Sequence, residues 1–247
     1  MDGVDIRFLG TGDAFGSGGR LHTATLVRSG EGSLLVDCGP STLGALRRQA
    51  LEPGDVDAIV LTHLHGDHFA GIPFLLMDAH FASHRTRPLV IAGPVGLEER
   101  IGSLLAVLFP GTDAPPFRFP VTYLEWTERQ RIQAGPGVVT PFEVKHSTAI
   151  RCYGLRVAMA GRILAFSGDT EWTDALVPLS AGADLFLCEC FGDESAPPNH
   201  LDYRTLQSHR DALTCRRLLL THMGDDMLRR ASTLDIATAD DGLVMII

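Results

Sequence analysis

Thr62-His63-Leu64-His65-Gly66-Asp67-His68 is the stretch of this sequence that decides how the rest of the chain is interpreted. It follows the apolar run Ala58-Ile59-Val60-Leu61, which is typical of a buried strand, and it precedes a pattern with helical spacing. The potential ligands therefore lie on a loop at the end of a strand. This arrangement suits two adjacent divalent metal ions, with zinc as the first choice and manganese or iron as alternatives. A histidine-rich surface loop is the competing interpretation, which the position directly after a buried strand disfavours.

Composition and charge limit the classes of protein that this chain can be. It has 247 residues, of which 45% are hydrophobic, and its net charge of -9 comes from 21 basic and 30 acidic residues. We expect one soluble, cytoplasmic domain over residues 1–247, because neither a secretory signal nor a membrane-spanning run is evident. The acidic balance disfavours nucleic acid as a partner. Five cysteines, several of them in apolar runs, favour reduced thiols over a disulfide framework.

The pattern of apolar residues predicts a chain that begins rich in strands, then alternates strands with helices, and then repeats that plan. Strands are predicted at 5–9, 23–28, 33–36, 58–61, 89–91, 121–124, 137–144, 154–158, 163–166, 185–188, 218–220 and 243–247. Helices are predicted at 41–50, 68–82, 95–108, 173–179, 203–213 and 225–231. This order favours an α/β fold, an αββα sandwich of two mixed β-sheets with helices on the outer faces.

The His-x-His-x-Asp-His loop resembles the signature of the metallo-β-lactamase superfamily, and the resemblance covers nearly the whole chain. In that superfamily a histidine, a bridging aspartate and a final histidine follow on later strand ends, and His146, Asp169 and His222 each follow an apolar run here. The resemblance implies a metal-dependent hydrolase with two ions. It implies one ion on His63, His65 and His146 and the other on Asp67, His68 and His222, with Asp169 between them. Asp37 matches an early aspartate that supports the ligand loop, although a turn aspartate before glycine is an equal alternative.

Finer features resemble the ribonuclease Z-like phosphodiesterases within this superfamily. One is the opening Phe8-Leu9-Gly10-Thr11-Gly12, and another is Lys145-His146-Ser147 followed by Cys152-Tyr153-Gly154. The third is Glu189 at the end of an apolar run, followed by Asn199-His200-Leu201-Asp202, which looks closer to the small cyclic-phosphate phosphodiesterase of phosphonate breakdown. An ordinary strand-end charge and a helix-cap neighbour are the alternatives for Glu189 and His200.

The resemblance implies a division of catalytic roles among three side chains. Metal-activated hydroxide would be the nucleophile, and Asp67 would orient it. His200 would stabilise the phosphoryl oxygens and protonate the leaving group, and Glu189 would position His200 and raise its pKa. The predicted substrate is a small or cyclic phosphodiester.

Other functions stay open at this point. A lactone, ester or amide hydrolase could use the same ligands, because the site activates water for any electrophile. A tRNA 3′-processing endonuclease is disfavoured, since the interval from Phe69 to Lys145 shows no basic, glycine-rich arm. A non-catalytic metal-binding protein is disfavoured because every ligand position is filled. A homodimer is possible by resemblance.

Several further side chains have no assigned role in the sequence. His22 is a candidate to line the pocket, and Trp126 and Trp172 are candidate pocket aromatics. His80, His84 and His209 lack ligand spacing, and we expect them to be solvated.

Overall fold

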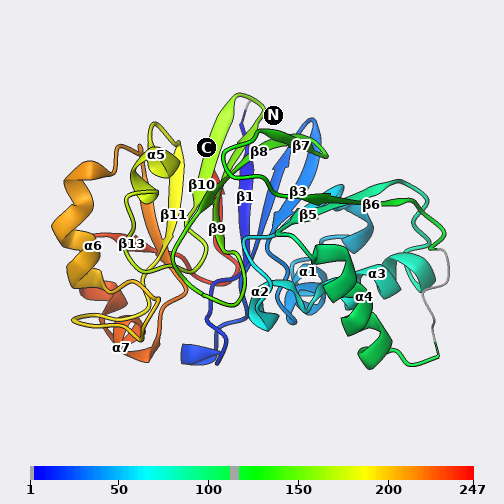
Figure 1. Ribbon diagram of the computed structural model, residues 1–247, viewed down its shortest axis with the longest axis horizontal. Coiled ribbons are helices and arrows are strands. Elements are labelled where there is room, and N and C mark those ends of the chain that lie inside the picture. The colour runs from blue at the N-terminus through cyan, green and yellow to red at the C-terminus, as the bar shows by residue number, and fades with distance from the viewer. Residues whose placement is uncertain (1–2, 112–116) are drawn as a thin grey trace.

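Two seven-stranded β-sheets packed face to face form the centre of the structure, a computed structural model that describes residues 3–111 and 117–247 (Figure 1). The strand order is β14-β1-β2-β3-β4-β5-β6 in the first sheet and β13-β12-β11-β10-β9-β8-β7 in the second. Apolar side chains from both inner faces fill the space between the sheets, among them Phe8, Val36, Leu155 and Phe166. Alternation of apolar residues along each strand therefore places one face of each sheet in a shared core.

The first sheet combines an antiparallel and a parallel half. It contains β1 (Asp5–Gly10), β2 (Ala24–Ser29), β3 (Gly32–Val36), β4 (Ala58–Val60), β5 (Leu89–Gly93), β6 (Val121–Glu125) and β14 (Val244–Ile246). Strands β14, β1, β2 and β3 pair antiparallel, whereas β3 to β6 pair parallel.

The second sheet has the same mixed character. It contains β7 (Ile132–Ala134), β8 (Gly137–Glu143), β9 (Tyr153–Met159), β10 (Arg162–Phe166), β11 (Leu185–Glu189), β12 (Leu218–Thr221) and β13 (Ala237–Thr238). Strands β7 to β10 pair antiparallel, and β10 to β13 pair parallel.

Helices cover the outer face of each sheet, as Figure 1 shows. The first sheet is covered by α1 (Thr42–Arg48), α2 (Gly66–Phe69), α3 (Ile72–Phe81) and α4 (Leu97–Leu108), and the second by α5 (Leu176–Ser180), α6 (Tyr203–His209) and α7 (Asp225–Arg230). Short 3-10 helices lie at η1 (Ser17–Gly19), η2 (Pro53–Asp55), η3 (Arg210–Ala212) and η4 (Ala231–Thr233). The predicted αββα sandwich of two mixed sheets is confirmed.

The single helix predicted over 68–82 is wrong, because the chain forms α2 and α3 with a break at Gly71. The Gly71 N–H donates to the carbonyl of Cys38 at 2.9 Å, and a Cβ at Gly71 would lie 2.2 Å from the carbonyl oxygen of Gly39. Pro73, in the first turn of α3, has no N–H to continue the α2 ladder. The break lets the ligand loop close against the turn that follows β3.

Two short strands, β7 and β13, are absent from the sequence prediction.

In the described part of the chain, no helix is both long and apolar enough to span a bilayer. All five cysteines are free, and four of them are buried.

Candidate metal centre

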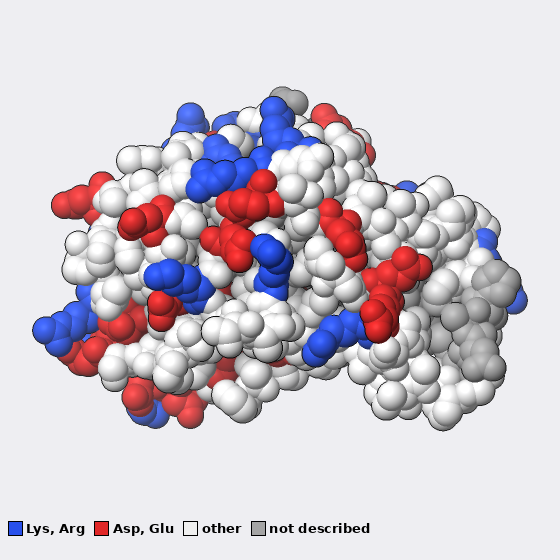
Figure 2. Space-filling model, in the orientation of Figure 1, with Lys and Arg blue, Asp and Glu red and all other residues white. Residues whose placement is uncertain are grey.

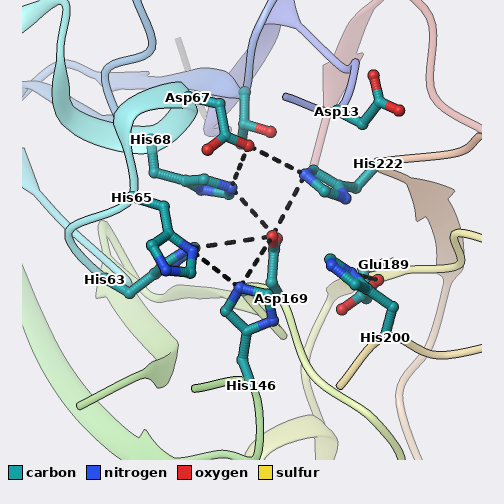
Figure 3. A network of polar contacts seen from close by, with 12 residues as sticks. Asp13, His63, His65, Asp67, His68, His146, Asp169, Glu189, His200 and His222 are labelled. Carbon is teal, nitrogen blue, oxygen red and sulfur yellow. Dashed lines mark hydrogen bonds and ion pairs between the residues drawn. The ribbon is translucent and has the colours of Figure 1, made fainter. Parts of the chain in front are cut away.

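The predicted ligands meet at one edge of the sandwich because they follow strands that end there. The carboxyl ends of parallel strands lie at the same edge of a sheet. The loop after β4 and the short helix α2 together supply four side chains, and the segments after β8, β10 and β12 supply one each: His63, His65, Asp67, His68, His146, Asp169 and His222. Figure 3 shows these side chains converging on Asp169.

Three imidazoles form the first group of candidate ligands, and their nearest nitrogens lie within 4.8 Å of one another. His65 Nδ1 is 3.1 Å from His63 Nε2 and 2.9 Å from His146 Nε2. His146 Nδ1 donates to the carbonyl of Asn199 at 3.0 Å, which leaves its Nε2 facing the group. Burial lowers the pKa of all three rings, so they are neutral and can offer lone pairs at neutral pH.

Two carboxylates and two imidazoles form the second group. His68 Nε2 lies 3.2 Å from both Asp67 Oδ2 and Asp169 Oδ1. His222 Nε2 lies 3.4 Å from Asp67 Oδ2 and 3.3 Å from Asp169 Oδ2. Burial opposes charge here, but the carboxylates raise the pKa of both histidines, and the histidines hold the pKa of Asp169 well below its usual range.

Asp169, a member of the second group, also lies near the first group. Its Oδ2 is 3.8 Å from His146 Nε2 and 4.0 Å from His63 Nε2, in addition to its contact with His222. Its Oδ1 and His68 Nε2 are both buried without a hydrogen-bond partner. Buried polar atoms that lack partners and converge on one point need a cation or water. This donor set therefore fits two divalent ions with Asp169 between them.

Asp37 supports the second group from behind. It is fully buried with a left-handed φ of 58°, and it accepts from the Thr62 N–H and Thr62 Oγ1, each at 2.8 Å. Its Oδ2 lies 2.7 Å from His68 Nδ1. An Nδ1–H donated to Asp37 directs His68 Nε2 toward Asp67 and Asp169. Of the two interpretations of Asp37, the structure favours the supporting role.

Glu189 and His200 form a pair beside the ligands (Figure 3). His200 Nδ1 is 3.1 Å from Glu189 Oε2, and Glu189 also accepts from the Thr170 N–H. The His200 ring stacks on that of His222 with centroids 5.7 Å apart and meets that of His146 edge-on at 4.8 Å. His200 therefore lies next to both groups of candidate ligands and is partly open to solvent.

The predicted direction of the His200 pKa shift is wrong. Burial lowers the pKa of His200, whereas burial and the neighbouring Asp169 raise the pKa of Glu189 well above its usual range. Glu189 is fully buried, so its charged form is itself disfavoured and acts weakly on the ring. One proton shared between the two side chains is consistent with both shifts.

The tryptophans and histidines that were given no ligand role in the sequence analysis have the following positions in the structure. Trp126 is not a pocket aromatic: it is buried, and its Nε1 donates to the carbonyl of Leu61 at 2.8 Å, just before the ligand loop. Trp172 stacks on His209 at 4.1 Å. The expectation that His80 is solvated is wrong, because it is buried and accepts from the Arg118 N–H. His22 is half-buried, with Nδ1 unpartnered.

Sequence reasoning missed Asp241, which fixes the backbone at the centre. It accepts from the Thr11 N–H at 2.9 Å, Thr11 Oγ1 at 2.8 Å and the Leu21 N–H at 2.7 Å. The Thr11 carbonyl in turn accepts from the N–H of His222, whose φ of 54° is left-handed. Asp240-Asp241-Gly242 has only the signature of a surface turn, so no local signal marks Asp241.

Solved structures share this architecture and define the class of protein. The metallo-β-lactamase fold protein YhfI from Bacillus subtilis aligns with a TM-score of 0.80 and 23% identity over 99% of this chain and 100% of that one. Human tRNase Z, short form, aligns with a TM-score of 0.74 and 28% identity over 98% of each chain. A diphosphatase from the PhnP family aligns with a TM-score of 0.75 and 20% identity over 98% and 97%. The fold is that of the metallo-β-lactamase hydrolases, in their ribonuclease Z-like branch.

Within that class the sequence identifies a family. The family described as "Anti-Pycsar protein Apyc1" matches residues 4–241, and the chain belongs to it. A protein named ribonuclease Z from Lachnoclostridium phytofermentans is 36% identical over 92% of this chain and 89% of its own length.

Proposed function

We propose that this protein is a dinuclear metal-dependent phosphodiesterase that hydrolyses a small or cyclic phosphodiester. The observation that carries the proposal is the Glu189–His200 pair, whose histidine stacks beside His222 and is not needed to complete either group of ligands. Hydrolysis of a phosphodiester produces an alkoxide that must be protonated, and a partly exposed imidazole next to the ligands is placed for that step.

The residues of the two groups fit the roles that this reaction needs. His63, His65 and His146 would hold one ion, Asp67, His68 and His222 the other, and Asp169 would bridge them. Two divalent ions bound there would lower the pKa of a water molecule and polarise the phosphoryl oxygens. Asp67 would accept a hydrogen bond from the attacking water. His200 would stabilise charge on the phosphoryl group and release a proton to the leaving oxygen, while Glu189 would hold the ring in place.

The surface supports a small substrate over a long nucleic acid. Within the described part of the 69–145 interval, Arg85 is buried and donates to the carbonyls of Gly54, Val56, Arg87 and Pro88. Arg87 pairs with Asp57 at 2.8 Å. Figure 2 shows acidic and basic side chains interspersed over most of this face, with a group of basic side chains near its upper edge, at the opposite end of the molecule from α2. Binding along many phosphates requires clustered cations.

A substrate panel tests this function. Bound metals are quantified first, and the same preparation is then assayed with bis(p-nitrophenyl) phosphate, a 2′,3′-cyclic nucleotide, a simple lactone and a precursor tRNA. We expect turnover of the two small phosphodiesters. Lactone turnover without phosphodiester turnover would overturn the proposal, and cleavage of precursor tRNA alone would favour the activity for which the ribonuclease Z relative is named.

A further inference from the structure

The turn that leads into His200 has an uncommon backbone conformation. The His200 N–H donates to the carbonyl of Pro197 at 3.2 Å, which closes a turn of four residues. Pro198 fixes φ at about −65° at the first central position of this turn. Asn199 has a left-handed φ of 68° at the second central position. This combination is a type II turn, and asparagine and glycine are the residues that tolerate its second position.

The carbonyl of Asn199 holds a ligand of the first group. It lies 3.0 Å from His146 Nδ1, and because a carbonyl oxygen can only accept, the proton of this ring is on Nδ1. The lone pair of the neutral ring is then on Nε2, which lies 2.9 Å from His65 Nδ1. One backbone oxygen therefore selects the tautomer of His146 that can bind a metal ion.

The residue that follows this carbonyl is the candidate acid. His200 Nδ1 lies 3.1 Å from Glu189 Oε2, and the His200 ring meets the ring of His146 edge-on with centroids 4.8 Å apart. The carbonyl of Asn199 and the N–H of His200 belong to one planar peptide unit. The acceptor that holds His146 and the backbone that carries His200 therefore move together.

The chain after His200 is also fixed. The carbonyl of buried Leu201 accepts from the Phe191 N–H at 2.8 Å. Asp202 caps α6, where its Oδ1 accepts from the Thr205 N–H at 2.7 Å. The segment that contains His200 is therefore held by the turn at one end and by the start of α6 at the other.

We infer that Asn199 is a positioning residue. Its left-handed conformation places its own carbonyl on His146 and the next side chain on Glu189, which aligns a ligand of the first group with the proton donor. The side chain of Asn199 is exposed, so the role belongs to its backbone conformation. The part of the inference that concerns His200 rests on the proposed function, because that function makes His200 the acid.

Two substitutions at Asn199 test the backbone role. Asn199→Gly removes the exposed side chain and keeps access to a positive φ, so we expect zinc affinities close to those of the wild type. Asn199→Pro fixes φ at about −65° and is also disfavoured at this position of a type I turn, so the carbonyl should leave His146. We expect one of two zinc ions to bind about 10- to 100-fold more weakly in Asn199→Pro, as measured by competition with a chromophoric chelator.

A substitution at another left-handed residue controls for a general loss of stability. Ala160, with a φ of 47°, lies in the hairpin between β9 and β10, at the opposite end of β10 from Asp169. Ala160→Val adds a β-branched side chain to a strained backbone far from the ligands. It should bind both zinc ions as the wild type does.

A carbon-13 label detects the contact with His146 directly. Asn199 is the only asparagine of the sequence, so asparagine enriched at its backbone carbonyl gives one carbonyl signal for the whole chain. In metal-free protein we expect this NMR signal to shift in His146→Ala, which removes the donor. It should stay in place in His63→Ala, which removes another ligand of the first group.

Turnover tests the link to the acid. At metal concentrations that saturate both groups, Asn199→Pro should have a kcat about 10²-fold below that of Asn199→Gly for a phosphodiester with an alkoxide leaving group. Bis(p-nitrophenyl) phosphate should be less affected, because its leaving group needs no proton. Equal losses on both substrates would contradict the positioning of His200.

Three further results overturn the inference: equal zinc affinities in Asn199→Gly and Asn199→Pro, an equal weakening of both ions in Asn199→Pro, or a carbonyl signal that His146→Ala leaves unchanged. If Asn199→Pro fails to fold, the carbonyl signal decides. Metal and carbonyl effects as expected, in a protein whose wild type hydrolyses no phosphodiester, would support the positioning of His146 and contradict the proposed function.

Discussion

Single residues at the centre differ in how far the sequence could reveal them. His63, His65, Asp67 and His68 are close together in the chain, so their proximity in space follows from one loop after one strand. His200 and Glu189 could be proposed only by resemblance, since nothing local pairs residues that are 11 positions apart. The direction of the His200 pKa shift could not be predicted, because it depends first on how deeply the fold buries the His200 ring.

Asp37→Asn tests the support behind His68. Asparagine tolerates the left-handed backbone, so the fold should be kept. If the asparagine oxygen keeps accepting from the Thr62 N–H, its NH2 group faces His68 Nδ1, and the ring loses the acceptor that fixes its Nδ1–H. We expect metal affinity at the second group to fall by about 10- to 100-fold. Dialysis against graded concentrations of a chelator, followed by metal analysis, measures this. Asp55→Asn, which changes an exposed carboxylate, is the control; equal metal retention in both variants would contradict the account.

The His200→Ala variant distinguishes the loss of a proton donor from the loss of the metal centre. We expect turnover of a substrate with an alkoxide leaving group to fall by about 10²- to 10⁴-fold. Bis(p-nitrophenyl) phosphate should be less affected, because p-nitrophenolate leaves without being protonated. Metal content should equal that of the wild type, and exposed His84→Ala is the control. Loss of metal from His200→Ala, or equal losses on both substrates, would argue against an acid role.

At the scale of elements, strand positions follow from apolar runs, and each predicted strand has a counterpart in the structure. The missed strands lack that signal: β13 has two residues, and β7 follows the polar Arg129-Gln130-Arg131 at a sheet edge. The break between α2 and α3 arises from the close approach of the turn after β3, a tertiary contact that helical periodicity cannot show. The conformation of the glycine-rich opening loop around Thr11 could not be predicted from the sequence. The Thr11 N–H donates to Asp241, which lies 230 positions away in the chain.

Asp241→Ala tests this anchor. The variant removes the acceptor of three hydrogen bonds, and we expect a loss of unfolding free energy of about 1–3 kcal/mol. Because the Thr11 carbonyl holds His222, metal binding at the second group should weaken as well. Chemical denaturation and metal titration give the two quantities. Asp240→Ala removes the exposed neighbouring carboxylate and should change neither; an Asp241→Ala protein with wild-type metal affinity would refute the link to His222.

At the scale of the whole molecule, the candidate centre joins the two sheets. The loop after β4 belongs to the first sheet, whereas His146, Asp169 and His222 follow strands of the second. The sandwich architecture could be predicted because apolar patterning repeats along the chain. The pairing of ligands across the sheets could not be derived from spacing, because it depends on how the sheets pack; it came from resemblance.

The two groups of ligands should respond differently to pH. In the metal-free protein, burial lowers the pKa of His63, His65 and His146, so a metal binding there displaces few protons near pH 7. Carboxylates raise the pKa of His68 and His222 despite burial, so those rings carry protons that a metal must displace. We therefore expect the affinity for the ion at the second group to fall as the pH drops from about 8 to 6. The affinity for the ion at the first group should change little over the same range. Calorimetry in buffers of different ionisation enthalpy counts the protons released, and equal release for both ions would contradict this assignment.

The central claim is that two metal ions at this centre hydrolyse a phosphodiester. Phosphorus NMR, with metal-free protein titrated by Mn²⁺ or Zn²⁺ in the presence of a 2′,3′-cyclic nucleotide, tests it most directly. We predict hydrolysis to a phosphomonoester at a rate that rises with added metal and levels off at two equivalents per chain, and Asp169→Ala should lose this activity together with at least one metal. The absence of phosphodiester hydrolysis at every metal loading, in a protein that binds both ions, would contradict the claim.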